Sequence, residues 1–135
     1  MIKVYAKGVF DILHYGHINF FKLAKGLGDW LTVGVTPDER VISMKRQPLF
    51  DGQERAIVVE SIRYVDQVLL DGPREITLDF MREHNFDLYV FGSKNHDERE
   101  VRLYDCRDLP SDMILEIPYT HGVSTTEIIN TSKKY

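Results

Sequence analysis

The ten residues Gly8-Val-Phe-Asp-Ile-Leu-His-Tyr-Gly-His17 lie between a short β-rich run, 2–6, and a longer run, 16–27, whose apolar positions recur at helical spacing. Gly26 and Gly28 end the second run. The stretch therefore predicts a turn from a first strand into a first helix. It decides the fold, because a strand whose following helix leads back to a parallel strand is the unit of an α/β sheet.

The rest of the chain repeats this alternation. The further β-rich runs are 30–35, 65–70, 88–91 and 113–117, and the further helical runs are 51–63, 76–84, 99–106 and 124 onward. Capping-box patterns open two of these helices, at Asp51 with Glu54 and at Ser124 with Glu127. This order predicts an α/β fold: one Rossmann-like, three-layer domain over residues 1–135 with a five-stranded parallel sheet.

The composition excludes several classes of protein. The 135 residues suit one domain, and 17 basic against 21 acidic residues argue against a non-specific nucleic-acid binder. Cys106 is the single cysteine, which rules out an intrachain disulfide and a thiolate metal cluster. Residues 1–5 resemble neither a signal nor a transit peptide, and no apolar run reaches the ~18 residues that cross a bilayer. We expect a cytoplasmic protein without a membrane partner.

The histidines of the first stretch suit a polyphosphate. His14 and His17 are three apart, so they share one side of a helical turn at the start of the first helix. Free amides and the helix dipole favour anions there, and Gly8 and Gly16 give the backbone freedom for a close approach. The imidazoles would donate hydrogen bonds to phosphate oxygens that gain charge, and would not act as nucleophiles.

Two histidines near a helix start are also compatible with ordinary surface residues, or with a metal site that has Asp11 as its third ligand. The complete string, with both glycines placed after a strand, favours the phosphate hypothesis. We therefore expect no metal held by the protein itself.

A second stretch, Gly122-Val-Ser-Thr-Thr-Glu127, places three hydroxyls at the start of the last predicted helix. Ser124 alone is explained as a helix cap. Thr125 and Thr126 would still be able to bind a second set of phosphate oxygens.

These motifs together resemble a known family. Gly8-Val-Phe-Asp11 followed by His14-Tyr-Gly-His17 is similar to the H-x-G-H signature of the nucleotidyltransferase superfamily, in its cytidylyltransferase-like branch. The resemblance is greatest to glycerol-3-phosphate cytidylyltransferases, extends to the choline- and ethanolamine-phosphate enzymes, and is poorest over 93–112. The further segments that carry it are 27–29, 33–35, 38–39, 54–55, 62–66 and 122–126.

The resemblance implies transfer of CMP from CTP to a phosphorylated alcohol, with release of pyrophosphate, Mg²⁺ carried by the nucleotide, and a homodimer. It also implies a role in cell-wall or capsule biosynthesis. The expected catalytic residues are His14, His17 and Arg46. The expected nucleotide-binding residues are Gly8, Val9, Phe10, His14, Gly16, His17, Arg46, Arg63, Gly92, Thr120, Gly122, Val123, Ser124, Thr125 and Thr126.

The segment 37–50 has no clear period, which predicts a mobile basic loop. The resemblance implies that cations of this loop close over the triphosphate, and Arg46 falls at such a position. Arg55 and Arg63 fall eight apart on the helix predicted over 51–63, roughly on one face. A pair between Arg63 and Asp66 is a structural alternative to a ligand role for Arg63.

The kind of acceptor substrate is predicted from positions at which this sequence differs from the family pattern. Met44 and Thr77 stand where glycerol-phosphate relatives have lysines, and Lys7 stands where the choline and ethanolamine enzymes tend to have an aspartate. A lysine there would repel a cationic amine. The candidate acceptor-binding residues are Lys7, Asp11, Arg74 and Lys94.

Two rival functions follow from the same departures. Tyr119 replaces the arginine with which CTP-using relatives begin the last motif, which keeps open an ATP-dependent adenylyltransferase acting on a sugar phosphate such as heptose phosphate. The absence of cations at Met44 and Thr77 keeps open a non-catalytic nucleotide-binding domain.

Overall fold

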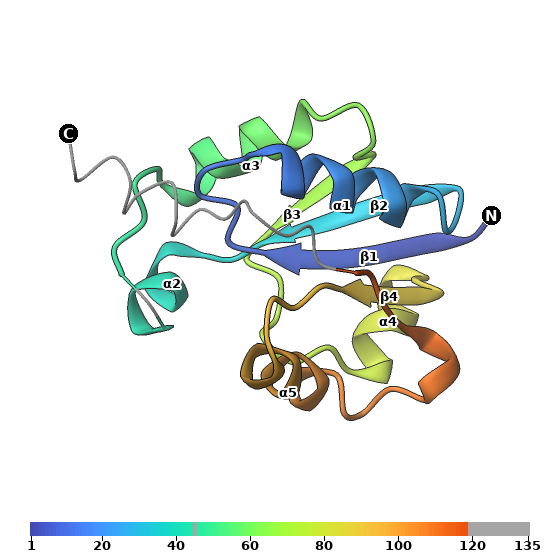
Figure 1. Cartoon of the computed structure of the whole chain (residues 1–135). Helices are drawn as coiled ribbons and strands as arrows, with labels where there is room; N and C mark the ends of the chain where they lie inside the picture. Colours follow the sequence, from blue (N-terminus) through green and yellow to red (C-terminus); the bar gives the residue numbers. More distant parts are fainter. Residues whose placement is uncertain (45, 119–135) are drawn as a thin grey trace.

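The computed structural model describes residues 1–44 and 46–118, and these form a parallel sheet with helices on both faces (Figure 1). The sheet has five strands in the order β3-β2-β1-β4-β5. The strands are β1 (Lys3–Gly8), β2 (Trp30–Val35), β3 (Gln67–Leu70), β4 (Leu88–Phe91) and β5 (Ile114–Glu116). Every pairing is parallel, which confirms the predicted Rossmann-like sheet.

Helices connect the strands as the alternation predicted. They are α1 (Tyr15–Lys25), α2 (Asp38–Met44), α3 (Gly52–Glu60), α4 (Leu78–His84) and α5 (His96–Asp105), with a short 3₁₀ turn at Ser111–Met113. Asp51 caps α3 through a hydrogen bond from the Glu54 amide, with the reciprocal bond also present. The predicted capping box is therefore confirmed.

Two apolar clusters form the core, one on each face of the sheet. On one face, Val4 and Val33 of the sheet pack with Phe21 of α1 and Val59 of α3. On the other face, strand residues pack with α4 and α5; this cluster includes Tyr5, Ile76, Met81, Phe86, Tyr89, Phe91 and Cys106. The chain therefore has the expected three layers, with α1 and α3 opposite α4 and α5 (Figure 1).

Several predicted boundaries are wrong. Helix α5 begins at His96 and not at Arg99, and two further differences have a physical reason. Residues 37–50 are not all loop, because α2 forms within them: the Pro37 carbonyl accepts from the Arg40 and Val41 amides, and Val41 is fully buried. A helix of seven residues is too short to show a clear apolar period. Helix α3 ends at Glu60 and not near Arg63, because two tight turns follow it, from Ile62 to Val59 and from Val65 to Ile62. The last predicted helix lies outside the described residues.

A buried tyrosine explains why the residue in the middle of β2 is a glycine. The hydroxyl of Tyr5 would lie 2.1 Å from a Cβ built on Gly34, so a side chain at position 34 cannot be accommodated beside it. Among the described residues, this hydroxyl has no hydrogen-bond partner, and Tyr5 is fully buried. Burial raises the pKa of Tyr5 well above its ordinary value.

We therefore expect Tyr5→Phe to leave the free energy of unfolding unchanged or to raise it by up to about 1 kcal/mol, because the variant removes an unsatisfied polar group from the core. Urea unfolding measures this. Tyr89→Phe removes a hydroxyl from the same apolar cluster and is the control variant. A loss of more than about 2 kcal/mol in Tyr5→Phe alone would show that the hydroxyl has a stabilising partner.

Candidate nucleotide-binding site

The strand order reverses between β1 and β4. The chain runs from β1 outward through β2 to β3, and then returns to β4 and β5 on the other side of β1. Ligands of open α/β sheets bind beyond the carboxyl ends of the strands at such a reversal. Gly8 ends β1 and Gly92 follows β4, so two of the predicted nucleotide-binding residues lie at this edge.

His14 and His17 form the first turn of α1 together with the backbone. His14 is the N-cap residue, and its Nδ1 accepts a hydrogen bond of 3.0 Å from the Gly16 amide. The Nδ1 of His17 accepts one of 3.2 Å from the His14 amide. The ring centroids lie 4.0 Å apart. The two predicted histidines are thus side by side, and they form a capping box in which imidazoles replace the usual hydroxyl and carboxylate.

This arrangement selects one tautomer of each ring. A nitrogen that accepts a hydrogen bond from a backbone amide cannot carry a proton, so the proton of each neutral imidazole lies on Nε2. Both rings are therefore oriented by Nδ1 and donate through Nε2–H. A pair of oriented N–H donors at a helix start is what stabilisation of phosphate oxygens requires.

Phe10 holds the turn that precedes the histidines. It adopts a positive φ of 53°, a region that non-glycine residues rarely occupy. Its ring packs against His17 and Phe21, and its Cζ would lie 2.6 Å from a Cβ at Gly8. The aromatic ring of Phe10 therefore accounts for the glycine at position 8, for which the sequence had suggested a close approach by a ligand.

Arg55 of α3 is a fully buried clamp on the same edge of the sheet. Its guanidinium and Nε donate to the carbonyls of Val9, Thr36 and Phe50 at 2.8–3.0 Å. It also donates to the Asp38 carboxylate at 2.6 Å. One side chain thus joins the turn after β1, the end of β2 and the starts of α2 and α3. No local pattern indicates this role, because an arginine at a helical position is usually solvated.

The clamp contributes to the acid sensitivity of the fold. The hydrogen bond from Arg55 lowers the pKa of Asp38 below its ordinary value of 3.8, against a smaller opposite effect of burial. A carboxylate with a depressed folded pKa stabilises the protein above the unfolded pKa, and that stability is lost as the pH falls through the folded pKa. We therefore expect Asp38→Asn to show a shallower loss of stability than the wild type below about pH 4. Thermal melting between pH 2 and 7 measures this, and an identical slope in both proteins would contradict it.

Asp11, in the turn after β1, forms an ion pair with Arg46. Both oxygens of the buried Asp11 carboxylate accept from the backbone, from the Leu49 amide at 2.9 Å and the Phe50 amide at 3.0 Å. Arg46 lies 3.4 Å from the same carboxylate and is partly exposed. Asp11 therefore fastens the segment 46–50 to the turn after β1. Its assignment to the acceptor stays a prediction, and these contacts explain its burial without a ligand.

We expect Asp11→Ala to destabilise the protein by roughly 1–3 kcal/mol, because two buried amides lose their acceptor. Amide hydrogen exchange at Leu49 and Phe50 should become faster than the loss of global stability alone explains. The amides of β1 should become faster only by the amount that this loss of global stability accounts for. Asp29→Ala, whose exposed carboxylate accepts from the Ile2 amide, provides a comparison at the opposite edge. Unchanged protection at Leu49 and Phe50 would refute the fastening role.

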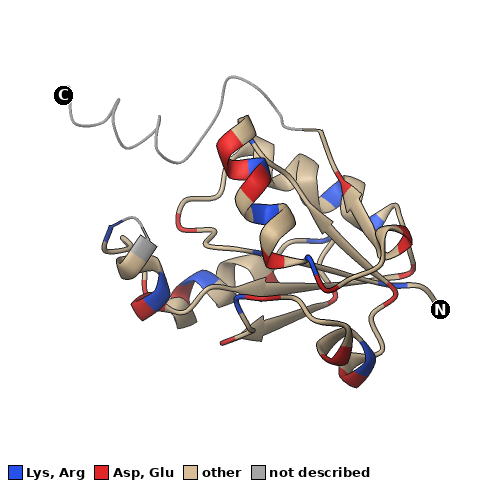
Figure 2. Cartoon of the chain, turned by 90° about the horizontal axis from the view of Figure 1, so that it is seen from below, with Lys and Arg blue, Asp and Glu red and all other residues tan. Residues whose placement is uncertain are grey.

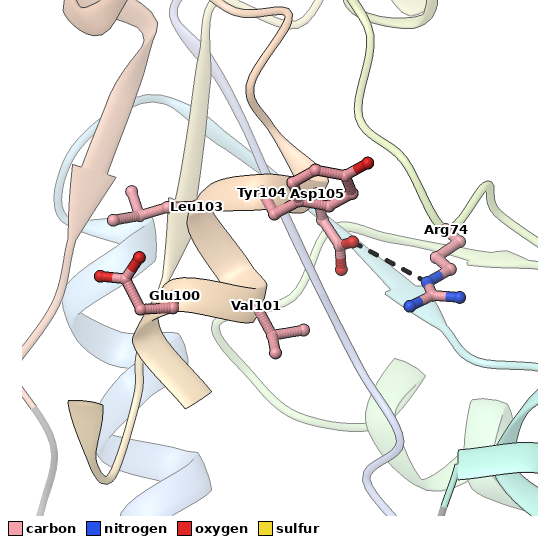
Figure 3. Close-up of a pocket in the computed structure, with 6 residues that line it drawn as sticks. All are labelled: Arg74, Glu100, Val101, Leu103, Tyr104 and Asp105. Atoms are coloured by element: carbon pink, nitrogen blue, oxygen red, sulfur yellow. Dashed lines mark ion pairs between the residues drawn. The ribbon is translucent and has the colours of Figure 1, made fainter. Parts of the chain in front are cut away.

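Two predicted acceptor residues meet on the opposite face of β1. The Nζ of Lys7 donates to the Arg74 carbonyl and lies 3.3 Å from Asp105 Oδ2. The Nε of Arg74 lies 3.8 Å from Asp105 Oδ1. Burial lowers the pKa of Lys7, and Asp105 opposes this shift. Beside this cluster is a hollow of about 540 Å³ that is lined by Arg74, Glu100, Val101, Leu103, Tyr104 and Asp105 (Figure 3).

The other predicted residues are placed less centrally. Lys94 is exposed between β4 and α5 and does not line the hollow. Arg63 is exposed and lies over the Tyr64 ring, and Asp66 pairs with Lys25, so the predicted Arg63–Asp66 pair is wrong. Thr77 caps α4 through a bond from the Phe80 amide. Six predicted nucleotide-binding residues lie outside the described range: Thr120, Gly122, Val123, Ser124, Thr125 and Thr126.

No group of three or more metal-ligating side chains occurs among the described residues. None of the helices in this part of the chain is long and apolar enough to cross a bilayer. Lysine and arginine are interspersed with aspartate and glutamate along the described ribbon (Figure 2).

Curated proteins similar to this chain include several cytidylyltransferases. The chain is 38% identical over 95% of its length to the ethanolamine-phosphate cytidylyltransferase of Arabidopsis thaliana, of which it spans 31%. It is 33% identical over 95% of its length to the glycerol-3-phosphate cytidylyltransferase of Bacillus subtilis (strain 168), and spans 95% of that enzyme. The FAD synthase of Pyrococcus horikoshii is 37% identical over 89% of the chain, which spans 82% of it. The chain thus spans about a third of the ethanolamine-phosphate enzymes that it matches.

A solved structure has the same fold. The lipopolysaccharide core biosynthesis protein of Thermoplasma volcanium superposes with a TM-score of 0.72 at 32% identity, over 89% of this chain and 98% of that one. The cytidylyltransferase-like family matches residues 5–131, which take in part or all of every strand described above. By this match and by its paired histidines at the start of α1, the chain belongs to the cytidylyltransferase-like family of nucleotidyltransferases.

Proposed function

We propose that the chain transfers CMP from CTP to a phosphorylated alcohol, glycerol 3-phosphate or a similar polyol phosphate, and releases pyrophosphate. The observation that carries this proposal is the pair of imidazoles at the start of α1, each with Nδ1 bound to a backbone amide. This supports two Nε2–H donors side by side at the start of α1, the kind of group that transfer at an α-phosphorus needs.

The mechanism requires no covalent intermediate. A phosphate monoester is an anion near neutral pH, so its oxygen can attack the α-phosphorus directly once the two are aligned. Donation from His14 and His17 would stabilise the charge that builds on the α-phosphate oxygens. Mg²⁺ carried by the triphosphate would supply further charge neutralisation.

The departing pyrophosphate would be held by cations and hydroxyls. Arg46 is partly exposed and anchored to Asp11, which places a cation beside the turn that leads to the histidines. The hydroxyl-rich segment 122–126 would bind the β- and γ-phosphates. The names of the relatives support the substrate class, since they include enzymes of glycerol-3-phosphate and of ethanolamine phosphate.

The assembly and location are part of the same proposal. We expect a cytoplasmic homodimer that supplies activated polyols to cell-wall or capsule polymers. Helix α3 leaves Ile57 and Val58 exposed, at 66% and 49%, next to the segment 62–66. These apolar side chains support a subunit contact there, which light scattering of the purified protein would measure.

Adenylyl transfer is the second candidate function. The FAD synthase of Pyrococcus horikoshii is a relative of nearly the same length, and Tyr119 replaces the arginine that CTP-using relatives have before the last motif. An ATP-dependent enzyme that acts on a sugar phosphate would use the same two histidines.

One experiment separates the two functions. Purified protein with Mg²⁺ is supplied with CTP or ATP and a panel of polyol, sugar and amino-alcohol phosphates, and pyrophosphate release is measured. We expect pyrophosphate release with CTP and a polyol phosphate. The kcat/KM for ATP should be lower than that for CTP by at least about tenfold, because the wrong base loses one or two hydrogen bonds to the protein. A preference for ATP would establish the second candidate. A CTP-induced rise in melting temperature without turnover on any acceptor would indicate a non-catalytic nucleotide-binding domain.

A further inference from the structure

The hollow beside Lys7 and Arg74 is lined by a buried carboxylate, that of Asp105, which has two cationic side chains close to it. Asp105, the last residue of α5, is 4% exposed, and its carboxylate faces both Lys7 and Arg74. Two cations against one carboxylate leave this triad with a net positive charge. The Asp105 backbone carbonyl accepts from the Ile76 amide at 2.8 Å, so the end of α5 is fixed against the segment that leads into α4.

The two oxygens of Asp105 differ in their contacts. Oδ2 accepts from Lys7 at 3.3 Å. Oδ1 lies 3.8 Å from Arg74 Nε, which is an ion pair but too long for a hydrogen bond. Figure 3 shows this carboxylate between Tyr104 and Arg74 at the hollow, with the Oδ1–Arg74 pair dashed. A carboxylate oxygen can accept two hydrogen bonds, so Oδ1 retains capacity for a donor that enters the hollow.

We propose that Asp105 is a specificity-determining residue for the acceptor, and that its Oδ1 accepts a hydrogen bond from a hydroxyl group of a polyol phosphate. This inference rests on the proposed function. Lys7 precedes Gly8, the last residue of β1, on the strand that leads to the histidines. The acceptor phosphate therefore lies on the Lys7 side, and the rest of the acceptor extends into the hollow.

The charges around the hollow discriminate between acceptor groups. A cationic amine meets a net positive triad, since Lys7 and Arg74 together outweigh Asp105. Arg102 adds positive charge near Lys7. Glu100 and Arg74 carry opposite charges at the rim and are 59% and 61% exposed, so solvent screens both to a similar extent. A neutral hydroxyl donates to Asp105 without opposing either charge, and a site built to bind a hydroxyl rejects an analogue that lacks it.

The test compares three acceptors of similar size: glycerol 3-phosphate, propyl phosphate, which lacks the hydroxyls, and ethanolamine phosphate. Pyrophosphate release with CTP gives kcat/KM for each. We expect the wild type to prefer glycerol 3-phosphate over propyl phosphate by roughly 100-fold. Asp105→Asn should reduce that preference by about tenfold and leave the KM for CTP unchanged. Asp112→Asn, an exposed residue of the 3₁₀ turn, is the control and should keep the full preference.

A second variant tests the charge argument at an exposed residue. Arg74 is 61% exposed, so Arg74→Gln should fold even if Asp105→Asn does not. The remaining Lys7–Asp105 pair is neutral, so the ratio of ethanolamine phosphate to glycerol 3-phosphate turnover should rise about threefold to tenfold.

Each failure has its own meaning. Wild-type turnover of glycerol 3-phosphate and propyl phosphate at equal kcat/KM would overturn the role of Asp105 and leave the proposed function intact. The same conclusion would follow if Asp105→Asn kept the wild-type preference, or if Arg74→Gln kept the wild-type ratio of amine to polyol. Absence of CTP-dependent pyrophosphate release with every acceptor would overturn the proposed function itself.

Discussion

His17→Ala should lower kcat by roughly 10²-fold or more, the loss that follows removal of one preorganised donor to a transition-state oxyanion. The KM for CTP should change little, because a donor that acts mainly on developing charge contributes less to ground-state binding. His17 also accepts from the His14 amide, so the melting temperature must be recorded for the variant.

His96→Ala is the control for this prediction. His96 is the first residue of α5, and its side chain is 79% exposed. Its removal should leave kcat within about twofold of the wild type, because surface substitutions away from a site have small effects. A His17→Ala enzyme within a few-fold of wild-type kcat would contradict the proposed mechanism.

Arg55→Met should destabilise the protein by about 3–5 kcal/mol, a large part of the roughly 5–15 kcal/mol that holds a domain of this size folded. The variant keeps a long apolar stem but removes every donor to three carbonyls and to Asp38. These acceptors stay partly or wholly buried, and an unpaired buried group carries its full desolvation penalty.

Urea unfolding of Arg55→Met against Arg82→Met measures this loss. Arg82 is exposed in the last turn of α4, and its replacement should change the free energy of unfolding by about 0.5 kcal/mol or less. Equal stability of the two variants would show that Arg55 is not a clamp.

The strands and most helices are predictable from the sequence because their signals are local. Trp30–Val35 and Leu88–Phe91 match the observed strands residue for residue, since near-continuous apolar runs mark strands covered on both faces. The histidine pair is predictable for a similar reason. Two histidines three residues apart, with glycines at positions 8 and 16, are visible without any long-range contact.

The features that sequence reasoning misses depend on long-range contacts. Among the residues of α2 whose side chains the structure describes, Asp38 to Ser43, Val41 is the one fully buried apolar residue, which leaves no visible period. Arg55 has the pattern of a helix-face cation, although its partners include backbone carbonyls 5 to 46 residues away. Nothing local marks Asp105, because only the fold brings the end of α5 to Lys7 and Arg74.

Thr77 shows how local chemistry can replace a family residue. The resemblance to glycerol-phosphate enzymes implies a lysine at this position, but here the threonine hydroxyl accepts from the Phe80 amide and starts α4. If the proposed function holds, the cations that bind the acceptor come from elsewhere, and Lys7 and Arg74 meet at one carboxylate. This arrangement supports a different set of residues around the acceptor from the one that the family pattern implies.

The most direct test of the central proposal is a long-range ¹H–¹⁵N NMR spectrum of the histidine rings, recorded without and with CTP and Mg²⁺. The spectra should show His14 and His17 as Nε2–H tautomers with unprotonated Nδ1, and their Nε2 resonances should shift on addition of nucleotide while those of His96 do not. Nδ1–H tautomers, or Nε2 resonances that stay in place at saturating CTP, would contradict the assignment of these two rings to the triphosphate.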